Sequence, residues 1–292
     1  MLDKRKITCT NEDNISMEFT SKFSPFLLQN CDGIYEVDNN VTTKDNTMID
    51  GSTYLGSTTK MRNIVLTLAD KENHMKNRNL LYQLFKPKSP GTFKYEEEDE
   101  TRTIEYYVES VQFTSVKNVR VATVSLLCPD PFFQDLEDMV VQMSGWQKLW
   151  TFPHKFLDEK EAFGRRIQEK LKTIDNESAT DNLGITITMT AEGPVKNPAL
   201  YHVELGEYIK VGTDSKPLNL DNGDQLIITT ETNKKNIYLV KGGTKTTINE
   251  YMDEGSSFIQ LQSGQNSLRY EAESGEDYLN VSISFRNKYL GV

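Results

Sequence analysis

The sequence has few cysteines, few histidines and no long apolar run, and each shortage excludes a class of protein. Cys9, Cys31 and Cys128 are scattered and form no C-x-x-C pair, so neither a zinc site nor a disulfide framework is expected. No apolar run approaches the ~20 residues that a membrane-spanning helix needs. The N-terminus leads into polar sequence instead of the apolar core of a signal peptide. The chain is therefore expected not to insert into a membrane.

Positive charge is also in short supply. The chain has 33 basic and 43 acidic residues, which gives a formal net charge of -10. No basic stripe with interleaved aromatic residues is present, and electrostatic binding to phosphates requires such a stripe. We therefore do not expect nucleic acid to be a direct ligand of this chain.

Motifs for catalysis are missing as well. His74, His154 and His202 lie far apart and share no motif, and the sequence has no Gly-x-Ser-x-Gly, His-Glu-x-x-His or P-loop pattern. His74 is expected to be an exposed helix residue, and the other two are expected to pack. We predict no enzymatic activity and no cofactor, and we assign no catalytic, cofactor-binding or metal-binding residue.

Acidic residues are abundant, so chance pairs are expected. Glu207, Asp214, Asp221 and Asp224 are the carboxylates considered for a glycosidase pair or a calcium site. The segment 221–224 lacks the later glutamate of a calcium loop, and we interpret it as an Asx-type hairpin turn.

What the sequence has in quantity is strand pattern. Apolar and polar residues alternate with a period of two in several segments, which is typical of strands with one buried face. The clearest apolar sets are Leu279, Val281, Ile283 and Phe285; Ile185, Ile187 and Met189; and Leu268, Tyr270 and Ala272. Short strands separated by Gly and Asp turns predict a β-sandwich or barrel in the C-terminal half.

The N-terminal half is also rich in strand pattern but contains one predicted helix, 73–85. Asn73 is a candidate N-cap, Lys86 suits the negative C-terminal end of the helix dipole, and Pro87 ends the run. Two interpretations stay open: the helix covers an open sheet face, or it is presented to a neighbouring subunit.

Residues 93–113 predict a hairpin with a solvated acidic tip at 96–100. Ile104 and Tyr106 have one parity, whereas Val111 and Phe113 have the other. Since a one-residue slip moves side chains to the opposite face, we predict a β-bulge near Glu109 and Ser110.

The segment 158–172 fits two patterns. The four-residue spacing of Phe163, Ile167 and Leu171 favours a helix, and the alternation between them allows a strand. We predict helix from the pattern. A length of 292 residues favours two domains, and we place them at 1–145 and 146–292.

The run Leu126-Leu-Cys-Pro-Asp-Pro-Phe-Phe133 indicates a strand that ends at two prolines, with Cys128 as a small core residue. In the order in which they occur, this run and its neighbours resemble the distal tail protein (Dit) family of siphophages, the siphovirus tail component. The other segments that carry the resemblance are Gly51-Ser-Thr-Tyr54, Arg62-Asn-Ile-Val-Leu-Thr-Leu68, Asn79–Lys88, Gly91-Thr-Phe93, Val108–Phe113, Asn197-Pro198, Gly223-Asp-Gln-Leu226, Gly264-Gln-Asn266 and Tyr289-Leu-Gly-Val292.

The resemblance implies a mainly β protein with an N-terminal β-sandwich, one helix and a hairpin arm, followed by a galectin-like C-terminal β-sandwich. It also implies a homo-hexameric ring in the virion, at the tip of the phage tail, made in the bacterial host cytoplasm. The ring would join the tail tube protein to the tail-tip or tail-associated lysin protein and could carry receptor-binding proteins. DNA would pass through its channel without specific binding, which agrees with an acidic chain. The resemblance suggests strand for 158–172.

A closed ring needs heterologous contacts, and we predict them at the helix 73–85 and the hairpin 93–113. The alternative function is a host-adhesion module that binds cell-wall carbohydrate through the C-terminal domain. The tyrosines considered for it are Tyr201, Tyr208, Tyr238, Tyr251, Tyr270 and Tyr278, of which Tyr270 has the parity of a core residue.

Overall fold

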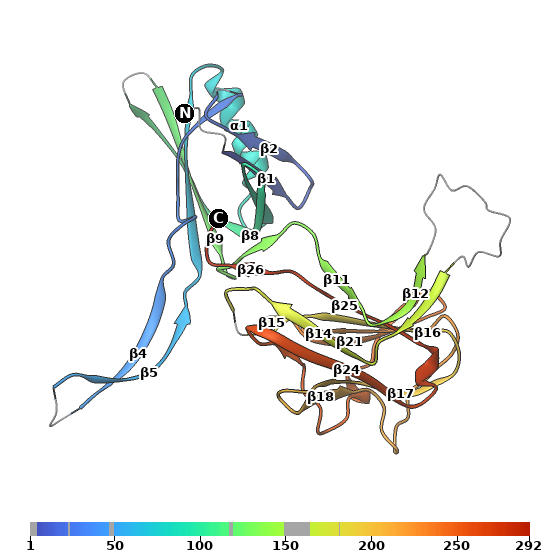
Figure 1. The fold of residues 1–292 in the computed structure, drawn as a ribbon. Helices are drawn as coiled ribbons and strands as arrows, with labels where there is room; N and C mark the ends of the chain where they lie inside the picture. Colours follow the sequence, from blue (N-terminus) through green and yellow to red (C-terminus); the bar gives the residue numbers. More distant parts are fainter. Residues whose placement is uncertain (1–4, 23, 47–49, 117–118, 149–163, 181) are drawn as a thin grey trace. The chain divides into compact units, whose positions relative to one another are not determined.

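The computed structural model describes residues 5–22, 24–46, 50–116, 119–148, 164–180 and 182–292. The chain divides into two compact units, and most of each unit is β-strand (Figure 1). Unit 1 consists of Met1–Leu136 and Lys288–Val292, and unit 2 consists of Glu137–Asn287. The prediction of a mainly β protein with two β-rich parts is confirmed.

The division falls after Leu136 and not after residue 145, and the last five residues return to unit 1. Strand pairing explains both differences. β11 (Met139–Gln142) pairs with β25 (Leu279–Phe285) of unit 2, and Met143 is fully buried in the core of that unit. β26 (Lys288–Tyr289) pairs with β10 (Phe133–Asp135) of unit 1. No local pattern indicates this last pairing, because its two strands lie more than 150 residues apart along the chain.

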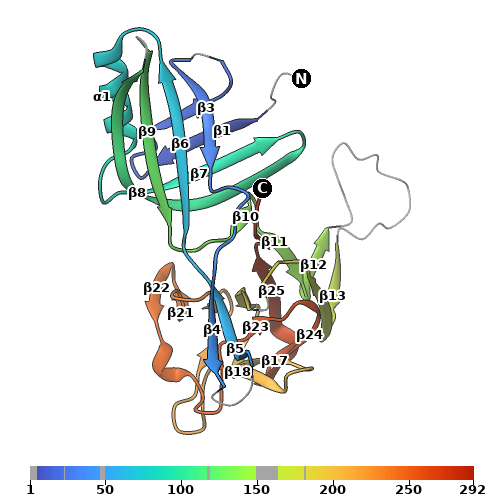
Figure 2. The same ribbon diagram turned by 90° about the vertical axis from the view of Figure 1, so that its left-hand side faces the viewer.

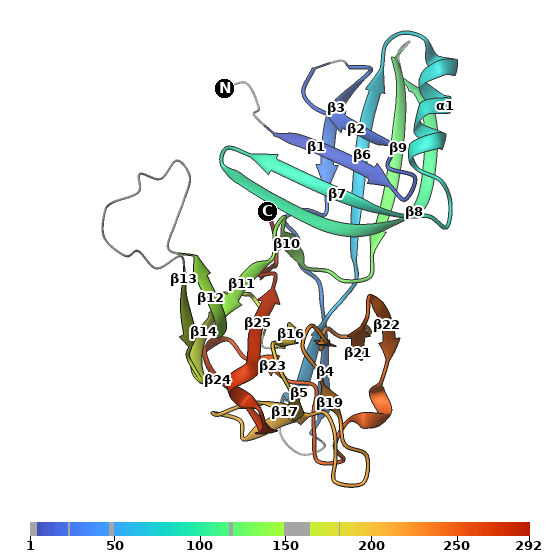
Figure 3. The ribbon, with the colours of Figure 1, turned by 90° about the vertical axis from the view of Figure 1, so that its right-hand side faces the viewer.

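The strands of unit 1 form one hydrogen-bonded network that folds over itself, so that β1 and β7 cross β6 and β9 (Figures 2 and 3). In hydrogen-bonded order they are β2 (Ser16–Phe19), β1 (Lys6–Asn11), β7 (Pro90–Glu97), β8 (Glu100–Val116), β9 (Val119–Cys128), β6 (Arg62–Asp70) and β3 (Phe26–Asp32), and β10 pairs with both β8 and β26. Cys128 is fully buried at the end of β9, as predicted, and Pro129 follows it.

The predicted helix is α1 (His74–Leu84), and its apolar stripe packs on the unit 1 core. Leu81, Leu84 and Phe85 are buried, and the Phe85 ring stacks on Phe19 at 6.2 Å between centroids. Burying such a side chain stabilises a fold by about 1.5–3 kcal/mol relative to leaving it exposed. The interpretation of a helix that covers a sheet face is therefore correct for this stripe.

Asn73 occupies the predicted N-cap position, but it adopts a left-handed conformation (φ 55°) and makes no side-chain capping hydrogen bond. Beside it, the Asp70 carboxylate at the end of β6 accepts a 2.9 Å hydrogen bond from Asn77 Nδ2 and pairs with His74 Nδ1 at 2.9 Å. His74 is accordingly half-buried instead of exposed. After the helix, Lys86 forms an ion pair with Asp13.

The hairpin predicted at 93–113 is β7 and β8, and the predicted bulge is confirmed. The register between β8 and β9 shifts between Val108 and Ser110, which leaves Glu109 as the extra residue. The Glu109 carboxylate accepts a 2.6 Å hydrogen bond from Ser125 Oγ across the strands. Glu98, Asp99 and Glu100 at the tip are exposed as predicted.

Glu96 differs from the rest of the predicted acidic tip, because it is paired. Its side chain is 26% exposed and forms 2.9 Å ion pairs with Lys6 and Lys94. Partial burial opposes its ionisation, but the hydrogen bonds from the two lysines outweigh burial and lower the Glu96 pKa below its usual value.

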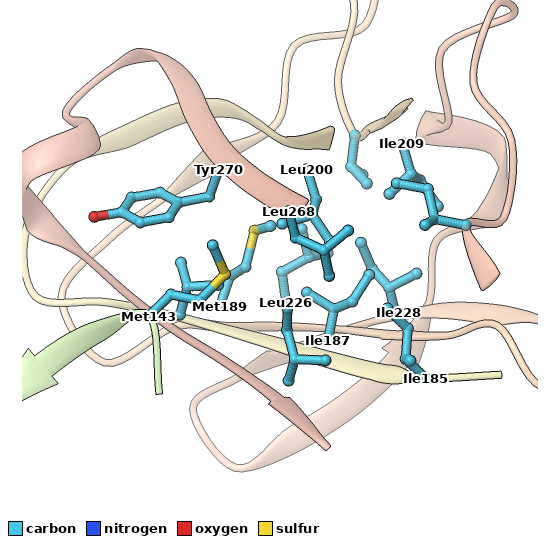
Figure 4. Close-up of a cluster of buried hydrophobic side chains, with 14 of the residues drawn as sticks. Met143, Ile185, Ile187, Met189, Leu200, Ile209, Leu226, Ile228, Leu268 and Tyr270 are labelled. Atoms are coloured by element: carbon cyan, nitrogen blue, oxygen red, sulfur yellow. The ribbon is translucent and has the colours of Figure 1, made fainter. Parts of the chain in front are cut away.

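Unit 2 is a sandwich of two sheets, and its core lies between them (Figure 4). One sheet has the order β11, β25, β16 (Thr186–Ala191), β20 (Gln225–Thr229), β21 (Asn236–Lys241) and β22 (Thr244–Thr247). The other has the order β14 (Leu171–Asn176), β24 (Gly264–Ser274), β17 (Val195–His202) and β18 (Glu207–Lys210), with β19 (Asn219–Leu220) beside β17. β15 (Leu183–Gly184) pairs with β23 (Gln260–Leu261), and two short 3-10 helices are η1 (Asn249–Tyr251) and η2 (Glu276–Tyr278).

The alternation predicted for unit 2 is confirmed. Ile187 and Met189 of the first sheet are fully buried, and Leu268 and Tyr270 of the second are at most 1% exposed (Figure 4). The predicted core position of Tyr270 is therefore correct.

The helix predicted for 158–172 is wrong where the structure describes it, and residues 158–163 lie outside the described residues. β13 (Gly164–Gln168) pairs with β12 (Ser144–Lys148), and β14 begins at Leu171 and pairs with β24. The partners are about twenty and about a hundred residues away along the chain, so pairing overrides a local spacing that suits both structures.

Candidate functional site

The histidines considered for chemistry do not come together. His202 is 1% exposed and structural: its Nε2 lies 2.9 Å from Asn266 Oδ1, and its Nδ1 accepts a 3.3 Å hydrogen bond from the Leu205 amide. His74 belongs to the start of α1 in unit 1. His154 lies outside the described residues.

Of the carboxylates considered for a glycosidase or calcium site, the structure brings together only Asp221 and Asp224. Asp221 and Asp224 form the predicted turn, in which Asp224 Oδ2 accepts a 2.9 Å hydrogen bond from the Asp221 amide, and Lys241 pairs with both carboxylates at 2.9 Å. Glu207 is exposed on β18, and Asp214 is exposed in the following loop. Over the described ranges, no three His, Cys, Asp or Glu side chains are grouped as metal ligands.

Of the tyrosines considered for sugar binding, four lie apart. Tyr270 is in the core, and Tyr278, the last residue of η2, is 47% exposed. The ring of Tyr238 lies under Lys245 Nζ at 3.9 Å, and that of Tyr251 lies under Lys216 Nζ at 4.0 Å.

The structure does bring Tyr201 and Tyr208 together, on the face of the second sheet that points away from the core. In the register of β14, β24, β17 and β18, Leu171 lies opposite Arg269, Arg269 lies opposite Tyr201, and Tyr201 lies opposite Tyr208. Directly opposite residues share a face and lie about 4.5–5.5 Å apart at Cβ. These four side chains therefore form a line across the sheet, which we call the tyrosine row.

The tyrosine row is held by contacts along its length. The Arg269 guanidinium carbon lies 5.1 Å from the centroid of the Tyr201 ring, and the Tyr201 and Tyr208 rings stack at 5.6 Å with an interplanar angle of 29°. The Tyr208 hydroxyl donates a 2.8 Å hydrogen bond to Asp253 Oδ2. This bond to a carboxylate raises the pKa of Tyr208 above its usual value, since ionisation would remove the donated proton.

A groove of about 380 Å³ borders the tyrosine row. We call it the tyrosine groove; its lining includes Leu171, Tyr201, Val203, Glu207, Tyr208 and Arg269. This volume falls in the range of about 300–1,000 Å³ that is common for small-ligand sites. The sequence analysis found the two tyrosines by residue type but missed Leu171 and Arg269, whose place in the groove depends on strand register.

A second exposed feature belongs to unit 1. β4 (Asn39–Asp45) and β5 (Ser52–Thr59) form a two-stranded sheet of their own, which we call the arm (Figures 1 and 2). Nearly all residues of the arm are exposed. A lone two-stranded hairpin is marginally stable in water. The resemblance implied a hairpin arm, and the arm is this hairpin, whereas β7 and β8 pair with other strands on both outer edges.

The arm contains a bulge that sets which side chains share a face. Thr42 lies opposite Gly56, but the next residue, Thr43, lies opposite Tyr54, so Leu55 is skipped. Val41 and Tyr54 consequently share one face. Val41, Tyr54 and Leu55 are 60%, 62% and 61% exposed. The arm therefore carries apolar side chains that are not buried in its own unit.

α1 also has an outer side, where Met75 is 69% exposed and Tyr82 is 48% exposed. Tyr82 meets Phe113 of β8 edge to face at 5.5 Å. No helix in the described part of the chain is long and apolar enough to cross a membrane.

Comparison with protein families gives one match in each unit. Residues 17–128 match the phage tail protein RIFT-related domain, and residues 178–289 match the C-terminal domain of the siphovirus-type tail component. Together the two matches span most of the chain. A comparison with curated proteins gives no match.

Solved structures share the fold over the full length. The crystal structure of the SPP1 Dit (gp 19.1) protein, described as a paradigm of hub adsorption apparatus in phages that infect Gram-positive hosts, matches with a TM-score of 0.69 at 12% identity, covering 97% of this chain and 99% of that one. A chain of the phage P2 baseplate in its activated conformation with Ca matches with a TM-score of 0.53 at 14% identity, covering 100% of both chains. At such identities these likenesses show the fold.

Proposed function

The chain belongs to the siphovirus-type tail component family, and on that premise we propose that it is the distal hub of a phage tail. As a member of this family it is a structural component of the phage tail and not an enzyme. The observation that carries the hub proposal is the match of both units, in order and over nearly the whole chain, to a protein described as an adsorption hub.

In the proposed assembly, six copies form a ring through unit 1. The ring joins the tail tube protein to the tail-tip or tail-associated lysin protein, and unit 2 or the arm can carry receptor-binding proteins. We place the protein at the tail tip of the virion after synthesis in the bacterial host cytoplasm. The net charge of -10 suits a channel through which DNA passes without specific binding, because like charge disfavours contact with phosphates.

The contacts of the proposed ring are best supplied by the arm and the outer side of α1. Four large apolar side chains of unit 1 are exposed and not part of its core: Val41, Tyr54, Met75 and Tyr82. The hairpin 93–113 was the other predicted contact, but its two outer edges already pair with β1 and β9. We therefore propose the arm in place of the hairpin 93–113 as one contact of the ring, and α1 as the other. A closed ring requires two different patches, one meeting the other on the next copy.

Light scattering during size-exclusion chromatography tests the ring. The chain has a mass of 33.4 kDa, so a closed hexamer has a mass of about 200 kDa. This mass for the chain alone, or six copies of the chain in a complex with the tail tube and tail-tip proteins, would support the hub. A chain that stays a monomer alone and in those mixtures would overturn it.

A second candidate function is host adhesion through cell-wall carbohydrate bound by unit 2. One observation favours it: the tyrosine groove joins two tyrosines to ionised side chains on an open sheet face. The test is retention of the full-length chain on a column of purified cell-wall polysaccharide. Elution from that column at the same volume as from a matrix without polysaccharide would oppose this function.

A further inference from the structure

We propose that the tyrosine groove is a binding site for a neutral saccharide, a hexopyranose unit or a short run of such units. The proposal rests on the second candidate function above and assigns to it a site, a ligand class and individual residues. It is independent of ring formation, since every residue of the groove lies in unit 2.

The apolar part of the lining suits the C–H face of a pyranose. Leu171 and Val203 are 55% and 51% exposed, and they share the groove with Tyr201 and Tyr208. Covering such side chains removes apolar area from water and is favourable by about 25 cal/mol per Å². Exposed aliphatic side chains beside tyrosine therefore favour a ligand with an apolar face.

The polar part of the lining suits hydroxyl groups. Arg269 carries a guanidinium with five N–H donors, and its ion pair with Glu271, at 3.1 Å, engages Nη2. Glu207 adds a carboxylate, which accepts hydrogen bonds. A sugar hydroxyl both donates and accepts, so one ring can use both groups. Hydrogen bonds to charged groups contribute more than those between neutral groups.

The charge of the lining favours a neutral ligand. Arg269 and Glu207 carry opposite formal charges, which cancel. His202 also borders the groove, but it is 1% exposed, and its two ring nitrogens already contact Asn266 Oδ1 and the Leu205 amide. A phosphate-bearing polymer would meet no net positive charge here.

The tyrosine row is organised before any ligand arrives. Arg269 lies over Tyr201, Tyr201 stacks on Tyr208, and the Tyr208 hydroxyl is fixed to Asp253. Ordering a free side chain on binding has an entropic cost that lowers affinity. A row that is already ordered avoids much of this cost, which matters for a weakly binding sugar.

The experiment uses the full-length chain and four neutral disaccharides: cellobiose, lactose, maltose and N,N′-diacetylchitobiose. Saturation-transfer NMR detects binding, and calorimetry gives Kd. We expect binding to at least one of the four, and we expect Tyr201→Ala and Arg269→Ala each to weaken it about tenfold, or ~1.4 kcal/mol. Tyr278→Ala, an exposed tyrosine of unit 2 outside the groove, is the matched control and should leave Kd unchanged.

Two further readouts separate the possible outcomes. Tyr208→Phe keeps the stacked ring but removes the bond to Asp253, so a smaller loss of affinity is expected, with an unchanged unfolding midpoint as the check on folding. Binding to none of the disaccharides, equal binding by all variants, or preference for a glycerol-phosphate polymer would each overturn the proposal. Assembly mass measured on the same variants reports on the hub separately.

Discussion

The guanidinium of Arg62 lies over the ring of Phe133, with its Cζ atom 4.9 Å from the ring centroid. The same side chain is 6% exposed and donates to backbone carbonyls from three separate segments of unit 1. Its Nε bonds Pro131 at 2.8 Å, its Nη1 bonds Gly33 at 2.6 Å, and its Nη2 bonds Leu290. One side chain thus ties the exit of β9 and the end of the chain to β6.

Arg62→Met should destabilise unit 1 by about 3 kcal/mol, because a buried carbonyl that loses its donor costs about 1–3 kcal/mol. Urea unfolding followed by circular dichroism measures the loss. Arg62→Lys should recover only part of it, since an ammonium lacks the fork that reaches several carbonyls. Arg120→Ala is the control, because Arg120 is exposed and should change stability by less than about 0.5 kcal/mol. Equal stabilities for the Arg62 and Arg120 variants would contradict this account.

Deletion of Glu109 tests the bulge in β8. Removing the extra residue gives Val111 and Phe113 the parity of Ile104 and Tyr106, so a regular strand can keep Tyr106 and Phe113 on the core face opposite β9. We therefore expect the deletion variant to remain soluble and to unfold cooperatively. Glu109→Ala keeps the bulge and loses the bond from Ser125, so it should cost only about 1 kcal/mol. A deletion variant that fails to fold while the alanine variant folds would contradict the assignment of Glu109 as the extra residue.

The arm is expected to act in assembly and not in the stability of the single chain. Val41→Ser combined with Tyr54→Ser changes two side chains that are at least 60% exposed, so the thermal midpoint should not move. The mass by light scattering should fall from about 200 kDa towards 33.4 kDa, because the face that a neighbour covers is gone. Thr42→Ser, on the opposite face of the same strand, is the matched control. Intact rings in the double variant would exclude the arm as a contact.

The cysteines give a prediction for alkaline pH. Burial raises the pKa of Cys128 to about 12 and that of Cys31 to about 12, and it raises the pKa of Cys9 well above its usual value. In the unfolded chain these thiols ionise near pH ~8.5. Their contribution to stability is therefore complete below that pH and is lost as pH rises towards 12.

The thiols should also react slowly in the native protein at pH 8, because the thiolate is the reactive form. Titration with a thiol reagent should label all three in denaturant and label them far more slowly without it. Replacing Cys128 with Ala should flatten the alkaline part of the stability curve. Fast labelling of the native chain at pH 8 would contradict the assigned burial.

Local pattern predicted the parts of this fold whose burial is regular. The alternation of β25 and the change of parity between Tyr106 and Phe113 both reflect side chains that enter a core, and both predictions are confirmed. The segment 164–172 was wrongly predicted because its spacing fits two structures and distant partners decide between them.

The candidate site was less accessible from the sequence. The tyrosine row joins residues from four strands whose register is fixed by the whole sheet, so Leu171 and Arg269 carry no local signal. The arm carries none either, because a hairpin that buries nothing shows no apolar period. The tyrosine row and the arm are both recognised by side chains that are exposed in the folded chain, and composition alone does not reveal which side chains these are.

Because Lys288–Val292 belongs to unit 1, unit 2 is an insertion within unit 1 and not a domain appended to it. During synthesis the ribosome releases residues 1–136 first, then all of unit 2, and only then the strand β26 that pairs with β10. Domains generally fold in the order in which they are made. Here unit 1 begins first but is completed last, so a ribosome that stops before residue 288 leaves a chain whose unit 1 lacks both β26 and the carbonyl of Leu290 that Arg62 binds. Folding of unit 1 in this way depends on residues that are made after all of unit 2.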